Sequence, residues 1–148
     1  MDFLTGWASS IPILHLAVTW YLVGLIWVVQ RIVYPAMEYV DPAPDRAVAA
    51  ERRHCDRMGF VVGPMMLAEG VLASWMLLDG IRVGRWFVPG VGVVLLLVIW
   101  LSTAFIQMPL HSRMLQGPEP KAQRRLVATN WIRTMSWSLR GLIALYLV

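Results

Sequence analysis

The sequence predicts an all-α integral membrane protein in which residues 1–148 form a single domain, a four-helix transmembrane bundle. Four apolar stretches, over residues 11–33, 58–78, 87–108 and 126–148, are each about 20 residues long, which is the length a helix needs to cross a bilayer. Hydrophobic residues make up 58% of the chain, and the mean hydropathy is +0.60. A soluble bundle needs a polar outer face, and residues 88–101 offer none.

The first helix is predicted to run from about Ile11, continue after Pro12 and reach Tyr34-Pro35. Its apolar run is longer than the apolar core of a signal peptide, and Met1-Asp2 carries no basic residue before it. We therefore expect the first span to remain in the mature protein.

The second helix follows a turn at residues 41–45, where Pro44 or Asp45 can open it. Residues 46–57 are charged, so this helix is predicted to extend into the cytoplasm and to enter the membrane near Met58. Asp79-Gly80 is expected to end it.

The third helix is predicted from about Pro89 to about Leu115, and the fourth from about Lys121 to the end of the chain, with a turn over residues 116–120 between them. Small residues let transmembrane helices approach closely. We expect such contacts at Gly24, Gly63, Gly70 and Gly92.

Basic residues are distributed unevenly over the three connections. The first and third connections hold ten, and the second holds only Arg82 and Arg85. The positive-inside rule then places the first and third connections in the cytoplasm and both termini outside, in a bacterial-type inner membrane. The net charge of +4 therefore indicates topology and contact with the lipid bilayer, and no nucleic-acid partner is expected.

Three prolines, Pro35, Pro64 and Pro109, occur at matched depth in the first three helices. Proline removes a backbone donor and pushes against the carbonyl four residues earlier. Kinks at one depth are predicted to splay the cytoplasmic half of the bundle and open a cavity there.

Polar side chains gather in the same half. Thr103, Gln107 and His111 repeat every four residues and form one stripe on the third helix. The other members of this polar set are Gln30 and Tyr34 on the first helix and Asn130, Arg133, Trp137 and Arg140 on the fourth.

Glu69 and Arg140 are the most costly residues to place in a membrane, because both lie about 16–21 Å inside the cytoplasmic boundary. We predict that they form an ion pair, either as a structural link or with Glu69 as a proton acceptor below the cavity. His15, alone near the outer end, is interpreted as a hydrogen-bonded packing residue.

His54 and His111 are predicted at the cavity rim. They could serve as a general acid or base, orient a ligand, or hold a metal ion or haem. A metal would need further ligands from Gln107 or a carboxylate such as Glu38 or Asp56. Neither a His-Glu-x-x-His nor a Cys-x-x-Cys spacing is present, and the single cysteine, Cys55, is interpreted as a passive thiol.

Two segments resemble the small four-helix membrane proteins that include the anthrone oxygenases. They are residues 102–115, which contain Gln107-Met108-Pro109-Leu110-His111, and residues 130–133, which read Asn-Trp-Ile-Arg. The resemblance implies a membrane oxygenase acting on a polycyclic phenol without a bound metal, with His111, Asn130, Trp131 and Arg133 lining the site. His15, Gly24, Arg31 and Tyr34 resemble, more weakly, the first helix of the four-helix haem protein that oxidises protoporphyrinogen.

The leading hypothesis is an oxidoreductase of the oxygenase type that binds a planar apolar substrate and needs no cofactor. Trp131 or Trp137 would stack on the substrate, Arg133 and Asn130 would stabilise an enolate oxygen, and His111 or His54 would take the proton. Further substrate contacts are predicted from Gln107, Thr103, Gln30 and Tyr34. The alternative is a subunit without catalytic activity that binds haem, quinone, pigment or lipid, or that braces a homo-oligomer or larger membrane complex.

Overall fold

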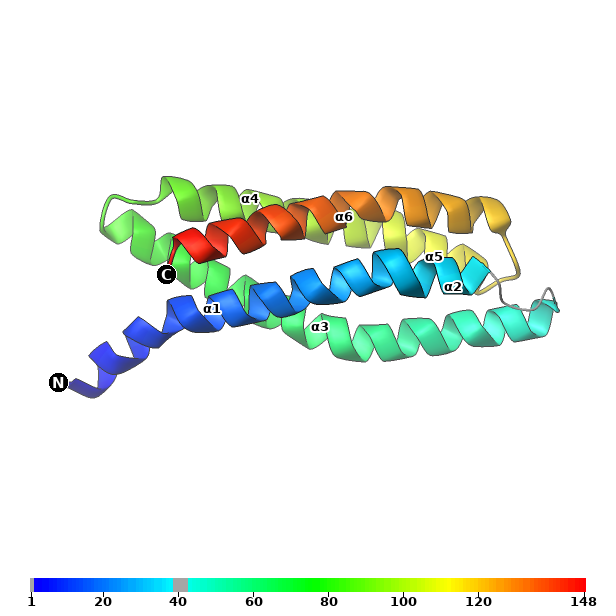
Figure 1. Ribbon diagram of the computed structural model, residues 1–148, viewed down its shortest axis with the longest axis horizontal. Helices are drawn as coiled ribbons and strands as arrows, with labels where there is room; N and C mark the ends of the chain where they lie inside the picture. The colour runs from blue at the N-terminus through cyan, green and yellow to red at the C-terminus, as the bar shows by residue number, and fades with distance from the viewer. Residues whose placement is uncertain (1, 39–42) are drawn as a thin grey trace.

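The computed structural model describes residues 2–38 and 43–148, with the side chains of residues 2–9 and of Glu38 left out of the description. The elements are α1 (Asp2–Val28), η1 (Val29–Val33), α2 (Tyr34–Glu38), α3 (Pro44–Arg82), α4 (Phe87–Ser102), η2 (Thr103–Gln107), α5 (Met108–Met114) and α6 (Pro120–Tyr146). The segments η1 and η2 are π-helical turns that join their neighbours without a break, so the chain forms four long helices (Figure 1). The described residues contain no strand, and the all-α prediction is confirmed.

The helix boundaries differ from the predicted ones chiefly at the first helix. α1 begins at Asp2, and Pro12 lies inside it rather than near its start. α3 begins at Pro44, where the missing N–H of proline costs no helical hydrogen bond. It continues past Asp79 to Arg82, and residues 41–42 of the predicted turn lie outside the described residues.

Two of the three prolines follow a π-helical turn. The N–H of Tyr34, just before Pro35, bonds to the carbonyl of Val29, and the N–H of Met108, just before Pro109, bonds to that of Thr103. Each bond spans five residues, and the wider turn fits the proline ring and its missing donor. Pro64 differs, because it lies on the exposed side of an unbroken α3.

Three of the four long helices, and not all four, are apolar enough to span a membrane. They cover Ser10–Met37, Pro44–Arg82 and Phe87–Met114. The fourth, α6, has 27 residues and is long enough, but it carries Asn130, Arg133 and Arg140 among its buried residues. The part of α6 in the predicted fourth stretch, residues 126–148, turns these polar side chains toward the inside of the bundle, and its crossing of a membrane stays a prediction.

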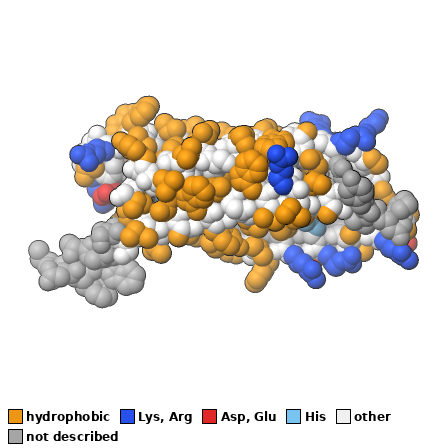
Figure 2. Space-filling model, viewed as in Figure 1, with side chains coloured by type: hydrophobic (Ala, Val, Ile, Leu, Met, Phe, Trp, Pro, Cys, Tyr) orange, Lys and Arg blue, Asp and Glu red, His pale blue; other side chains and the backbone are white. Residues whose placement is uncertain are grey.

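The helices pack around a core to which α1, η1, α4 and α6 contribute, including Leu22, Ile26, Ile99, Leu126 and Trp137. The outer surface is also apolar, with exposed Ile32, Phe60, Val71, Val94 and Phe105 among many others. Figure 2 shows hydrophobic side chains along the visible face and most Lys and Arg toward its two ends. An exposed apolar surface of this extent is typical of a membrane protein.

Glycines permit close helix approach at two of the four predicted positions. A Cβ at Gly70 would lie 2.9 Å from a ring atom of Trp100, and one at Gly92 would lie 3.6 Å from Ile143. At Gly24 and Gly63 a Cβ would meet no atom within 4 Å. The prediction is therefore wrong for Gly24 and Gly63, which make no close contact.

Candidate functional site

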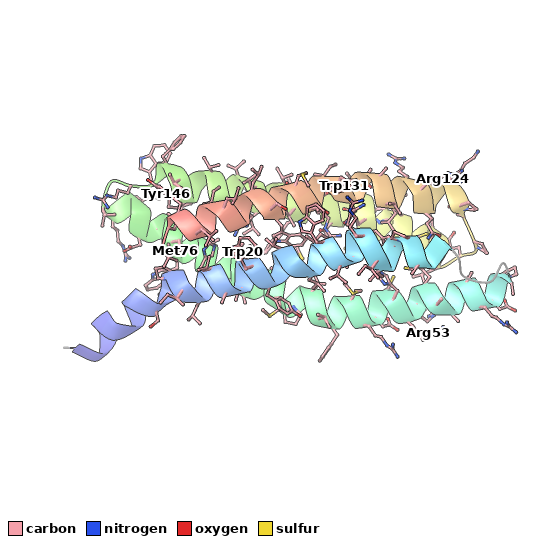
Figure 3. The ribbon with its side chains drawn as sticks, in the orientation of Figure 1. Trp20, Arg53, Met76, Arg124, Trp131 and Tyr146 are labelled. Atoms are coloured by element: carbon pink, nitrogen blue, oxygen red, sulfur yellow. The ribbon has the colours of Figure 1, made fainter. Side chains whose placement is uncertain are left out.

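A cavity of about 440 Å³ lies in the half of the bundle where α3 and α6 begin and α2 and α5 end. We call this half the basic half, because Arg53, Arg57, Arg113, Lys121, Arg124 and Arg125 surround its end. Figure 3 shows Arg53 and Arg124 extending away from the bundle there. Most of the cavity wall is apolar, and the lining includes Leu22, Ile26, Val29, Met58, Val62, Met66 and Leu115.

Polar groups from all four long helices also line this cavity. They include many of the site residues that the sequence predicts. Thr103, Gln107 and His111 all line it, as the stripe on the third helix predicts. They are joined by Tyr34, His54, Cys55, Arg133 and Trp137. The three prolines were predicted to splay the helices around the cavity, but Pro64 and Pro109 are exposed on the outer surface of the bundle. The polar side chains nevertheless face inward.

One wall carries a hydrogen-bonded cluster that joins α3 to α5. His111 Nδ1 lies 2.5 Å from Glu51 Oε1, and Cys55 Sγ donates to the same oxygen at 3.4 Å. Glu51 is buried, and the ring centroids of His54 and His111 are 5.5 Å apart. Tyr34 completes the cluster, with its ring centroid 6.0 Å from His54.

The electrostatics of this cluster lower the pKa of both Glu51 and His54. Both residues precede Met58, in the charged part of α3 outside the predicted span. Burial alone would raise the pKa of Glu51, but the hydrogen bond and charge of His111, with smaller effects of Cys55 and His54, hold it below its usual value. Burial lowers the pKa of His54, and the nearby His111 lowers it further. An imidazole beside a carboxylate-bound imidazole suits either proton transfer or ligand binding.

Two residues of the cavity wall hold buried nitrogens that have no hydrogen-bond partner among the described residues, Gln107 Nε2 and Arg133 Nε. The remaining groups of these side chains are held in place. Gln107 Oε1 accepts from Ser102 at 3.0 Å, and Arg133 Nη1 donates to Asn130 Oδ1 at 3.3 Å. The Arg133 guanidinium also lies 5.2 Å from the ring centroid of Trp137. Each nitrogen has almost no accessible surface, so a ligand oxygen could accept from it only by displacing the atoms around it.

Three predicted substrate contacts, Asn130, Gln30 and Trp131, do not line the cavity. Asn130 Nδ2 donates to Gln30 Oε1 at 2.8 Å, so both amides support Arg133 from behind. Trp131 lies instead between α6 and α1, edge-on to Trp27 with ring centroids 5.6 Å apart (Figure 3). Positions 131 and 137 are six residues apart and face different sides of a helix, and only Trp137 reaches the cavity.

The predicted pair of Glu69 and Arg140 is present below the cavity. Arg140 Nε donates to Glu69 Oε1 at 2.9 Å, and both side chains are almost fully buried. Thr19 donates to the same oxygen, and Trp137 Nε1 donates to Oε2 at 3.0 Å. The Glu69 carboxylate on α3 therefore accepts hydrogen bonds from Thr19 on α1 and from Trp137 and Arg140 on α6, and links three helices.

The Arg140 guanidinium reaches two further groups. It donates to the carbonyl of Gly92, where the absence of a side chain lets α4 come close. Its Nη2 lies 3.4 Å from Nε2 of the buried His15. The void bordered by His15 measures about 10 Å³.

Glu51 is the important residue that the sequence interpretation missed. Glu38 and Asp56 were the carboxylates expected near the histidines, but Asp56 is exposed and the Glu38 side chain lies outside the described residues. The signal was the spacing Glu51-x-x-His54, which puts both side chains on one face of a helix. Cys55 was interpreted as passive, yet it lies one turn from Glu51 and contacts it.

The fold and site define a four-helix bundle with apolar outer walls and an internal cavity, whose polar groups come from all four long helices. Comparison with known proteins finds no matching family model, no matching curated protein and no matching solved structure. The resemblance to the anthrone oxygenases thus stays a prediction from the sequence.

Proposed function

We propose that the protein is a small integral membrane oxidoreductase of the oxygenase type that binds a planar apolar molecule in the cavity of the basic half. The observation that carries this proposal is the convergence of the Gln107 and Arg133 side chains with the His111–Glu51 pair at one apolar cavity. Such a cavity suits a molecule with an apolar body and an oxygen acceptor at its edge.

The same proposal places the bundle in a bacterial-type inner membrane with both chain ends outside. At 1.5 Å per residue, the 39-residue α3 is about 58 Å long, roughly twice the hydrocarbon thickness. Its charged residues 44–57 would then project into the cytoplasm with the rest of the basic half. Reporter enzymes fused at Val148 and at Gly117 are expected to be active on opposite sides; activity on one side would contradict this topology.

The proposed chemistry starts with proton removal from an activated carbon between the rings of a phenolic substrate. His111, with Glu51 behind it, or His54 takes the proton, and Arg133 stabilises the enolate oxygen. The enolate carbon gives electrons to molecular oxygen and bonds to it. The methylene becomes a carbonyl, and the second oxygen atom leaves as water, so the oxidant is the co-substrate itself.

Filling the cavity is expected to reduce substrate binding while leaving the fold intact. Gly63 lines the cavity and has open space at its Cβ position, so Gly63→Phe places a ring in the binding volume. If the added ring and a bound hydroxylated anthrone compete for this space, the overpacking cost of about 1–3 kcal/mol corresponds to a roughly 5- to 150-fold loss of affinity. Binding and oxygen uptake of the purified protein measure this effect.

The matched control is Gly24→Phe, because Gly24 is also helical and open at its Cβ position but does not line the cavity. If wild-type protein and the control consume oxygen with the anthrone and Gly63→Phe does not, the proposal is supported. Equal affinity in all three would place the ligand elsewhere. Stoichiometric binding without oxygen uptake would instead favour the non-catalytic binding protein.

A further inference from the structure

We propose that Glu51, Cys55 and His111 form a binding site for a divalent transition metal at the wall of the cavity. The ligand atoms of these residues all lie within 4.8 Å of one another. They come from two helices, with Glu51 and Cys55 one turn apart on α3 and His111 on α5. This proposal does not depend on the oxygenase function, because metal binding is measured without substrate.

The donor set indicates which metal fits. A thiolate, an imidazole and a carboxylate together are ligands that zinc accepts, whereas magnesium and calcium prefer oxygen alone. In tetrahedral zinc sites, bonds of about 2.0–2.3 Å separate the ligand atoms by about 3.3–3.8 Å. The 3.4 Å between Cys55 Sγ and Glu51 Oε1 already matches, and His111 Nδ1, at 2.5 Å from that oxygen, would move outward by about 1 Å.

The proposed metal ligands are largely shielded from solvent. The side chain of Glu51 is 5% exposed and that of His111 is 16% exposed. The metal would displace the thiol proton of Cys55 and the proton shared by His111 and Glu51, so binding releases protons and strengthens as the pH rises.

Three protein ligands leave a fourth position, which is the arrangement of catalytic zinc sites. Cys55 and His111 both line the cavity, so this position would face a ligand inside it. His54 also lines the cavity and is not needed as a metal ligand, so it stays available as a base.

Cobalt is the probe for this site, because a cysteine-bound Co²⁺ gives a thiolate charge-transfer band in the near ultraviolet. The full chain, purified in detergent with a tag free of histidine, is titrated with Co²⁺ and then with Zn²⁺. We expect one Co²⁺ per chain, the charge-transfer band, and displacement of cobalt by zinc.

Variants decide whether these three residues are the ligands. Glu51→Gln and His111→Ala are each expected to weaken Co²⁺ binding more than about 100-fold. This is a larger loss than is typical when a residue that only hydrogen-bonds to a metal ligand is replaced. Cys55→Ser is expected to abolish the charge-transfer band. The control is Asp56→Asn, which changes an exposed carboxylate next to Cys55 and should leave the spectrum and affinity unchanged.

Two results would overturn the proposal. One is wild-type protein that binds no stoichiometric Co²⁺, which would leave the cluster as a hydrogen-bonded group only. The other is unchanged affinity and spectrum in both Glu51→Gln and Cys55→Ser. Since His111→Ala also removes a contact between α3 and α5, circular dichroism of each variant checks the fold, and Cys55→Ser, a change of one atom, carries the test if His111→Ala unfolds.

Discussion

Replacing Arg140 with methionine is expected to lower the free energy of unfolding by about 3–5 kcal/mol, because it leaves the buried Glu69 carboxylate without its counter-charge. The side chain of Glu69 is 0% exposed, so water cannot take over the role of the guanidinium. The variant also leaves the Gly92 carbonyl without its donor from Arg140. Unfolding of the purified protein in mixed micelles, followed by tryptophan fluorescence, measures the loss.

A double variant separates the ion pair from simple loss of packing. Glu69→Leu with Arg140→Met replaces both charges with apolar groups and is expected to recover much of the stability, as buried pairs often do when both partners are replaced. Arg82→Met is the control, since Arg82 is exposed at the end of α3. If Arg140→Met is no less stable than this control, the pair does not hold the bundle together.

Replacing His111 with alanine is expected to lower the rate of oxygen uptake with a hydroxylated anthrone by about 10²–10⁴-fold, the usual contribution of a general base. His111 is the imidazole that Glu51 orients, with 2.5 Å between the paired atoms. Because the ring makes up only part of a large apolar wall, kcat should fall while KM changes little. Steady-state oxygen consumption at saturating substrate measures this.

Two neighbouring variants serve as controls for that result. Arg113→Ala changes an exposed residue close by that is not among the cavity-lining residues, and it should keep wild-type activity. Cys55→Ser removes a metal ligand but leaves His111 and Glu51, so it should stay active if the reaction needs no metal. A loss in Cys55→Ser equal to that in His111→Ala would show that the metal, and not the free imidazole, supports turnover. An active His111→Ala would transfer the role of base to His54.

The two ends of the polar network meet at Trp137. Its ring lines the cavity and lies beside the Arg133 guanidinium, and its Nε1 donates to Glu69. The ion pair therefore fixes the orientation of one cavity wall as well as joining α3 to α6. Arg133 is held in turn by Asn130, which donates to Gln30, so Asn130, Arg133, Trp137 and Arg140 of α6 belong to one connected group.

The lengths of the apolar stretches and the spacing of polar residues along each helix account for the features of the fold and site that the sequence predicts correctly. The all-α class follows from the long apolar stretches, and the stripe of Thr103, Gln107 and His111 follows from their spacing, because both depend only on local periodicity. The partnership of Glu69 with Arg140 was also predictable, since an isolated charge at that depth is too costly to leave unpaired.

Contacts between distant segments were not predictable in the same way. Trp131 and Trp137 look alike in the sequence, but the rotation of α6 against α1 sends only Trp137 into the cavity. Glu51 gains its importance from His111, 60 residues away, and no local pattern specifies that pairing.

The sequence by itself determined that the chain is helical, that its helices are long and largely apolar, and that Glu69 and Arg140 should form a pair. These features depend on residue type and spacing along one helix. Only the tertiary structure decided which side chains meet. The packing of α6 hides its polar residues inside the bundle, and α5 brings His111 against Glu51 and Cys55. The reason is that helix rotation and packing depend on the shapes of several helices together.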